Sequence, residues 1–83
     1  MIPDNITREA VLKAIAEIDS EGIPPTRNSR TYHLVQNGRR YPPKYVISIA
    51  NKYVNGYELS HGEFTGGKQT NDFLRNLSFV IVP

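Results

Sequence analysis

The chain has 83 residues, of which 10 are Lys or Arg and 8 are Asp or Glu, with a formal net charge of +2 and no cysteine. This length suffices for one domain with one small core, and the absence of cysteine excludes a disulfide framework or a thiolate zinc site. Because the apolar runs are too short to span a bilayer and Asp4 and Glu9 stand where a signal peptide carries cations, we expect a single domain over residues 1–83 that lies in the cytoplasm and contacts no membrane.

The first predicted element is an amphipathic helix from residue 7 to about residue 20. Its apolar residues recur at helical spacing, and Gly22 provides a C-terminal stop. The opposite side of this helix is mixed to acidic, so we expect it to face away from a negatively charged ligand. The two prolines that follow cannot continue a helix, because proline lacks an amide donor. The chain is therefore expected to enter a polar loop over residues 26–30 that carries two arginines.

A β-hairpin is predicted next, with strands over residues 31–36 and 39–41. Asn37-Gly38 lies between them, and this dipeptide tolerates positive φ at both central positions of a type I′ turn. A two-residue loop then pairs Gln36 with Arg39, Val35 with Arg40 and Leu34 with Tyr41. Side chains alternate across a strand, so Arg39 and Arg40 should point to opposite faces, and only one of them should contact a given ligand directly.

A second helix is predicted to begin at Pro42-Pro43, because proline is accepted in a first turn, and to stop at Asn55-Gly56. Its expected buried stripe comprises Tyr45, Val46, Ile49, Ala50 and Tyr53, and its expected outer face comprises Lys44, Ser48, Asn51, Lys52 and Asn55. A third helix over residues 67–77, with Thr65 as the candidate N-cap, and a strand over residues 79–82 complete the chain. The order α-β-β-α-α-β predicts an α+β domain, in which a three-stranded antiparallel sheet, the hairpin plus the C-terminal strand, packs with three helices.

Positive charge is concentrated in one part of the chain. Residues 22–57 contain six basic side chains and no acidic one, whereas acidic side chains outnumber basic ones in residues 1–21. The six are Arg27, Arg30, Arg39, Arg40, Lys44 and Lys52. Tyrosines are interleaved with them, and cations together with aromatic rings are what a polyanion with flat bases requires. The sequence therefore favours nucleic acid as the ligand.

The segment 39–45 combines three cations and two aromatic rings at a predicted strand-to-helix junction. Lys44 near the helix start, with Arg39 or Arg40 on the strand, would form a phosphate clamp, because cations held on regular elements are already oriented. The alternative is a solvated charged turn beside tyrosines of the core.

A second candidate is the segment 65–71, where Gly66 and Gly67 precede the third predicted helix. Glycines there let an anion approach the free amides at the positive end of the helix dipole, so the segment could seat a backbone phosphate. Gln69 and Asn71 carry side-chain amides that could pair with base edges, adenine in particular. The alternative is a flexible helix cap without a ligand.

No catalytic residue, metal site or cofactor is predicted. His33 and His61 are the only histidines, and neither has a carboxylate or cysteine partner at the spacing of a metal site. The carboxylates are scattered, and the serines lack the flanking residues of a hydrolase nucleophile. We therefore expect a domain without catalysis of its own.

Four short motifs together resemble a known family. They are Ser29-Arg30-x-Tyr32, Asn37-Gly38-Arg39-x-Tyr41-Pro42-Pro43-Lys44, Phe64-x-Gly66-Gly67 and Phe73-Leu74-Arg75-x-Leu77-x-Phe79. Along nearly its whole length, the chain is similar to the N-terminal head domain of McrA-type modification-dependent HNH restriction endonucleases. It departs from the pattern at Ser78, where glycine is expected, but this position belongs to no proposed contact.

The resemblance implies a module that recognises methylated or otherwise modified bases in double-stranded DNA. Cleavage would be supplied by a separate HNH nuclease domain of the same parent chain or complex, from which this domain would be excised. A modified base is usually recognised outside the stack, which requires an aromatic-walled pocket, and Tyr32, Tyr41 or Phe64 could line it. The residues expected to contact DNA are Arg27, Ser29, Arg30, Tyr32, Arg39, Arg40, Tyr41, Lys44, Thr65, Gly66, Gly67, Lys68, Gln69 and Asn71.

Two other readings of the same cations stay open. The cations would also suit a protein-interaction domain that recruits an acidic partner, or a clamp that holds DNA whether or not it is modified. A small nuclease or hydrolase ranks last, because no metal or nucleophile set can be assembled from the sequence.

Overall fold

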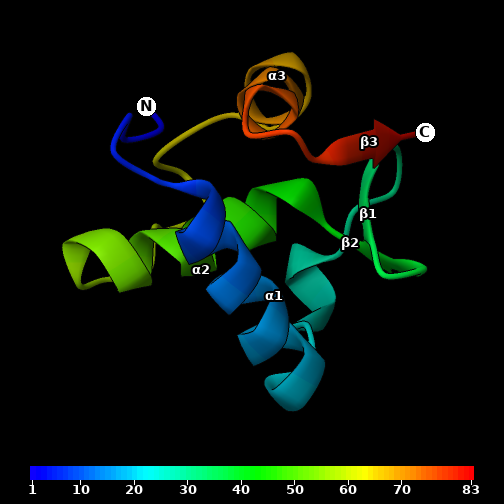
Figure 1. Cartoon of the computed structure of the whole chain (residues 1–83), viewed down its shortest axis with the longest axis horizontal. Coiled ribbons are helices and arrows are strands. Elements are labelled where there is room, and N and C mark those ends of the chain that lie inside the picture. The colour runs from blue at the N-terminus through cyan, green and yellow to red at the C-terminus, as the bar shows by residue number, and fades with distance from the viewer.

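The computed structural model describes the whole chain from Met1 to Pro83. Its elements, in chain order, are α1 (Arg8–Glu21), a short 3-10 turn η1 (Pro25–Arg27), β1 (His33–Gln36), β2 (Arg39–Tyr41), α2 (Pro43–Asn55), α3 (Lys68–Asn76) and β3 (Val80–Val82) (Figure 1). This order confirms the predicted α+β fold with three helices and three strands.

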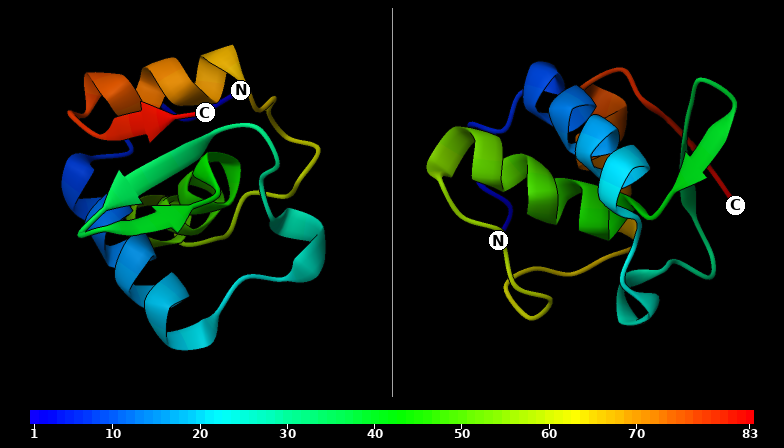
Figure 2. Two further views of the ribbon diagram at one scale, coloured as in Figure 1. Left: turned by 90° about the vertical axis from the view of Figure 1, so that its right-hand side faces the viewer. Right: turned by 90° about the horizontal axis from the view of Figure 1, so that it is seen from below.

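Helix α1 begins and ends as its sequence predicts. The Thr7 hydroxyl accepts a hydrogen bond from the Ala10 amide at 3.1 Å, which satisfies one of the free donors of the first turn. Gly22 ends the helix with a positive φ of 83°. The apolar face of α1 packs against α2, and the two helices cross each other beside the sheet (Figure 2).

The hairpin forms in the predicted register, with Gln36 opposite Arg39, Val35 opposite Arg40 and Leu34 opposite Tyr41. Asn37 and Gly38 have φ values of 52° and 76°, as a type I′ turn requires. Strand β3 pairs antiparallel with the other edge of β1, which gives the sheet order β2-β1-β3. Because side chains alternate along a strand, one face of this sheet covers the core with Leu34, Tyr41 and Ile81.

Helix α2 differs from the prediction on its outer face. Ser48 and Asn51 are fully buried rather than exposed, because the segment after α2 folds back over the helix. The Leu59 amide donates to the Ser48 carbonyl at 3.2 Å, and Asn51 Nδ2 donates to the Tyr57 carbonyl at 2.8 Å. Tyr53, predicted to be buried, is 43% exposed. A helix can therefore bury polar residues when a neighbouring loop satisfies them.

The turn after α3 explains why glycine is expected at position 78, where this chain has serine. This residue has a φ of 70°, in the left-handed region that glycine adopts without a steric penalty. The amides of Leu77 and Phe79 both donate to the Leu74 carbonyl around it, so the chain reverses sharply from α3 into β3. A glycine at position 78 would adopt this backbone conformation without strain.

The core consists of 19 buried apolar residues from all three helices, the inner sheet face and the loops. None of the three helices has the length and apolar character needed to cross a lipid bilayer. Packing around this core brings the loop before β1, the start of α2 and the start of α3 together at the surface.

Candidate nucleic-acid interface

A single cavity of about 300 Å³ opens where three separate parts of the chain meet. The first is the polar loop of residues 26–32, the second is the start of α2 at Pro42, Pro43 and Lys44, and the third is the start of α3. Its lining residues are Thr26, Arg27, Asn28, Ser29, Arg30, Thr31, Tyr32, Pro42, Pro43, Lys44, His61, Gly66, Gly67, Thr70 and Asn71. The lining includes three cations, Arg27, Arg30 and Lys44, and no carboxylate.

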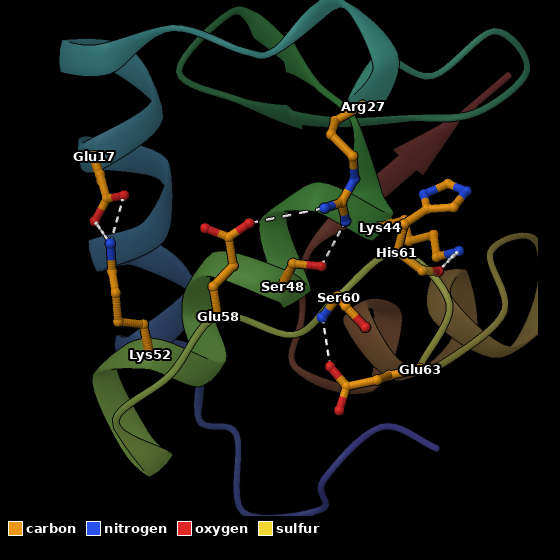
Figure 3. Close-up of polar contacts among 9 residues, drawn as sticks. All are labelled: Glu17, Arg27, Lys44, Ser48, Lys52, Glu58, Ser60, His61 and Glu63. Carbon is orange, nitrogen blue, oxygen red and sulfur yellow. Dashed lines mark hydrogen bonds and ion pairs between the residues drawn. The ribbon is translucent and has the colours of Figure 1, made fainter.

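Arg27 is held in place by protein groups on several sides (Figure 3). Its guanidinium donates to the Ser48 hydroxyl at 2.7 Å, lies 3.8 Å from a Glu58 carboxylate oxygen and stacks 5.1 Å from the centre of the Tyr45 ring. Only 12% of its side chain is exposed. Since Glu58 offsets much of its charge, Arg27 shapes the cavity wall more than it supplies free positive charge.

Lys44 is a partly buried cation of the cavity. Its ammonium donates to the His61 carbonyl at 2.6 Å (Figure 3). The same ammonium lies 5.3 Å from the centre of the Phe64 ring. Burial lowers the pKa of Lys44 below its ordinary value, and the positive charge of Arg27 lowers it further. No carboxylate pairs with Lys44, so an anion placed beside it would stabilise its charged form.

The loop of residues 26–32 contributes the third cation. Arg30 is exposed and forms no ion pair with any acidic side chain. The Ser29 hydroxyl donates to the Tyr32 carbonyl, which fixes the turn that carries Arg30. Tyr32 is 37% exposed, and it is the only tyrosine or phenylalanine in the lining.

Helix α3 presents an open N-terminus to the cavity. Its N-cap is Gly67, which has no side chain to accept a hydrogen bond, so the prediction of Thr65 as N-cap is wrong. The Thr65 hydroxyl donates instead to Gln69 Oε1 at 2.8 Å, and the Thr65 carbonyl accepts from the Thr70 hydroxyl at 2.7 Å. These contacts fix the glycine pair while leaving the first amides of α3 without a protein acceptor.

Comparison with protein families assigns the chain. A family model described as the ScoMcrA-like N-terminal head domain matches residues 4–83. The chain belongs to this family. No curated protein and no solved structure matches it. The family assignment confirms the resemblance that the four sequence motifs indicated.

The head domain gathers 8 of the expected DNA contacts around the cavity. These are Arg27, Ser29, Arg30, Tyr32, Lys44, Gly66, Gly67 and Asn71. Gly66 lies closest to Lys44, because a Cβ at this glycine would stand 3.7 Å from Lys44 Cδ. Residues from two separate sequence candidates, the strand-to-helix junction and the segment before α3, thus belong to one site.

The remaining expected contacts lie outside the cavity lining. At the hairpin, Arg39 pairs with Asp19 at 3.3 Å, and the buried Tyr41 donates its hydroxyl to the same carboxylate at 2.6 Å. Burial raises the pKa of Tyr41, and its hydrogen bond to Asp19 raises it further. Arg40 is exposed on the other face of the sheet and has no ion pair. Lys44 lines the cavity and neither arginine does, so the phosphate clamp of Lys44 with Arg39 or Arg40 stays a prediction.

Two more expected contacts lie on the surface of α3. Lys68 pairs with Asp72 one turn further along the helix, at 2.5 Å, and Gln69 Oε1 accepts a hydrogen bond from the Thr65 hydroxyl. Phe64, a candidate wall of a base pocket, is 5% exposed and lies under Lys44 in the core. Of the three aromatic candidates for such a pocket, Tyr32 is the one that lines the cavity.

The head domain also recruits residues that sequence reasoning did not select. His61 supplies a backbone carbonyl to Lys44, and no local pattern marks a carbonyl for that role. Asn28 and Thr31 lie between selected residues of the loop, and the unbroken polarity of residues 26–31 was the signal for them. No three His, Cys, Asp or Glu side chains lie close enough together to hold a metal ion.

Proposed function

We propose that the head domain is a non-catalytic DNA-binding module that recognises modified bases in double-stranded DNA and directs a separate HNH nuclease domain to them. The observation that carries this proposal is the cavity, where cations of the loop of residues 26–32 and of the start of α2 meet the open N-terminus of α3 without a carboxylate in the lining. Membership of the ScoMcrA-like family supports the link to a restriction system. The domain would bind the DNA, and another part of the parent protein or complex would cleave it.

Duplex DNA fits the arrangement of charge on this face. Arg30 and Lys44 have no acidic partner, and the starts of two helices add positive ends of dipoles beside them. Such a surface binds the phosphate backbone and releases counterions, so affinity should fall steeply as salt rises. Phosphate contacts of this kind orient a protein on DNA without regard to sequence.

Recognition of a modified base would fall to Tyr32. Its ring is 37% exposed beside the cavity, where it can stack on a base that has left the helix. Stacking on a single aromatic ring contributes about 1–3 kcal/mol per base. Substituting Tyr32 by Leu should therefore reduce the preference for modified DNA more than it reduces overall affinity.

The decisive experiment compares one duplex in unmodified, 5-methylcytosine and N6-methyladenine forms, at low and at physiological salt. The proposal predicts salt-sensitive binding with a preference for one modified form. Equal affinity for all three would leave a DNA clamp that ignores modification, and loss of that preference in Tyr32→Leu would identify the residue responsible. Lys13→Glu, on exposed α1 surface, is a matched charge-reversal control for variants in the cavity.

A second candidate function, binding of an acidic protein partner, has its own supporting observation. On the outer face of the sheet, Val80 is 58% exposed, Val35 lies opposite it across the strands, and Arg40 lies opposite Val35. An exposed apolar strip beside a cation suits a protein surface better than a DNA groove. If Val80→Glu abolished capture of a partner while DNA binding was absent from the wild type, this second function would replace the first.

A further inference from the structure

Asn71 is a buried polar residue of the cavity whose side chain has no hydrogen-bond partner in the protein. It is 3% exposed, it lines the cavity, and its side-chain amide forms no hydrogen bond with the protein. Asn51, the other buried asparagine, has its side-chain amide paired within the protein: it donates to the Tyr57 carbonyl and accepts from Asn55 Nδ2 at 2.6 Å. Nδ1 of His33 is the only fully enclosed side-chain nitrogen or oxygen without a partner, so the unpaired amide of Asn71 opens into the cavity and is available to a ligand there.

Backbone donors around the cavity are free as well. The amides of Lys68, Gln69 and Thr70 at the start of α3 donate to no protein acceptor, and no side chain caps the helix. The start of α2 is uncapped in the same way, with the amides of Lys44 and Tyr45 unpaired. Two helix N-termini therefore begin at one cavity, and their dipoles favour an anion there.

The lining distinguishes an oxyanion from a base. A base needs flat apolar walls, whereas most of this lining consists of hydroxyls, amides, glycines, prolines and cations. Tyr32 and His61 are its only aromatic side chains. Oxygen atoms carrying negative charge accept hydrogen bonds from amides and pair with Lys or Arg. The donors in this cavity thus match a phosphoryl group in both charge and hydrogen bonding.

We infer that the cavity binds one phosphoryl group. Its donors are the side-chain amide of Asn71 and the backbone amides of the first turn of α3, and its cations are Lys44 and Arg30. This inference deepens the proposed DNA binding, on which it partly rests, because it specifies that a phosphate of the DNA backbone, and not a base, enters the cavity. Base recognition then belongs to Tyr32 beside the cavity, outside its polar interior. The same chemistry would also hold a free phosphomonoester.

Amide NMR spectra of the isotope-labelled domain test the inference directly. We expect inorganic phosphate to shift the backbone amides of Lys68, Gln69 and Thr70 together with the side-chain NH₂ of Asn71. The side-chain NH₂ of Asn51 is the internal control and should stay in place, because its partners lie within the protein. Shifts spread evenly over exposed lysines and arginines, with Asn71 unaffected, would overturn the inference.

Substitutions at Asn71 give a second test. Asn71→Asp keeps the shape and places a negative charge in the cavity, and we expect it to weaken inorganic phosphate binding by about ten- to hundred-fold. Asn76→Asp, an exposed residue at the other end of α3, makes the same change of charge away from the cavity and should have little effect. If Asn71→Asp does not fold, Asn71→Leu removes the amide without adding charge and should also abolish the phosphate-induced shifts.

A short DNA duplex then distinguishes the source of the phosphoryl group. Shifts of the same α3 amides by the duplex, with competition from inorganic phosphate, would assign the cavity to a backbone phosphate. Response to inorganic phosphate without any duplex binding would keep the phosphoryl site and reject the DNA proposal. Duplex binding that Asn71→Asp and Asn71→Leu both leave unchanged would reject the phosphoryl site and keep the DNA proposal.

Discussion

Two regions of this molecule draw cations from the same basic stretch of sequence, and the fold treats them in opposite ways. At the hairpin, Asp19 from α1 pairs with Arg39 and accepts a hydrogen bond from the Tyr41 hydroxyl. At the cavity, Arg30 and Lys44 meet two open helix N-termini, and no carboxylate belongs to the lining. In the first region the positive charge of Arg39 is paired with an acid of the same molecule, whereas in the second the charges of Arg30 and Lys44 have no acidic partner.

The comparison shows that a charge run in sequence is not a charge patch in space. Three of the six basic residues between positions 22 and 57 are paired with acids from outside that stretch. These pairs are Arg27 with Glu58, Arg39 with Asp19 and Lys52 with Glu17. Long-range packing therefore leaves three of the six basic side chains without an acidic partner. Arg30 and Lys44 line the cavity, and Arg40 lies on the outer face of the sheet.

The largest expected effect comes from reversing charge at the cavity. Arg30→Glu combined with Lys44→Glu should lower DNA affinity by about hundred-fold or more, because each charge-assisted contact contributes about 1.5–3 kcal/mol. The salt dependence of binding should also become shallower by about one phosphate contact per residue. Fluorescence anisotropy with a labelled duplex over a range of salt measures both quantities.

Arg39→Glu is the matched reversal at the hairpin, and we expect it to weaken DNA binding much less. The carboxylate introduced at position 39 would lie beside Asp19, and the repulsion between the two negative charges should lower the thermal stability somewhat. Equal loss of affinity in the hairpin and cavity variants would contradict the distinction between the two regions.

A carboxylate introduced at Gly66 should have the next largest effect. This glycine lines the cavity and has an ordinary φ, so Gly66→Asp places a negative charge near Lys44 without backbone strain. We expect about a tenfold loss of DNA affinity. Gly62→Asp is the control, since Gly62 also has an ordinary φ but does not line the cavity. Calorimetric titration of both variants with one duplex would show the difference, and identical affinities would contradict it.

A smaller effect is expected from pH. Burial and the nearby charge of Arg27 lower the pKa of Lys44, so its charged form destabilises the folded state below that pKa, and this penalty disappears as the pH rises through it. DNA affinity should accordingly begin to fall at a lower pH than an ordinary lysine would allow. Lys44→Arg keeps its charge, so its affinity should persist further into the alkaline range. Parallel pH profiles for wild type and Lys44→Arg would contradict this prediction.

The smallest expected effect comes from releasing the hairpin cation. Asp19→Asn removes the charge that pairs with Arg39 but retains an oxygen for the Tyr41 hydroxyl. Because an exposed ion pair contributes about 0.2–1 kcal/mol, DNA affinity should rise by no more than about five-fold. Binding measurements at low salt, with thermal unfolding alongside, would detect it. A larger gain would mean that the hairpin is also part of the interface.

Local sequence signals predicted most of the fold. Thr7 and Gly22 delimit α1, the Asn37-Gly38 turn sets the hairpin register, and Gly56 ends α2. Each of these depends on a residue and its immediate neighbours. One error occurred where another segment covers a helix: Ser48 and Asn51 are buried by the loop after α2. The other is local, because the Thr65 hydroxyl donates to the Gln69 side chain and Gly67 takes the N-cap position.

The sequence by itself determined the elements, their order, the hairpin register and the family, because caps, turns and periodic apolar positions act over a few residues. It also named most of the cavity residues, since glycines before a helix and cations at a junction are local features. Only the tertiary structure decided which of those cations are free, and that the starts of α2 and α3 share one cavity with an unpaired Asn71. The physical reason is that an ion pair or a cavity depends on distances between segments, and packing around the core sets those distances.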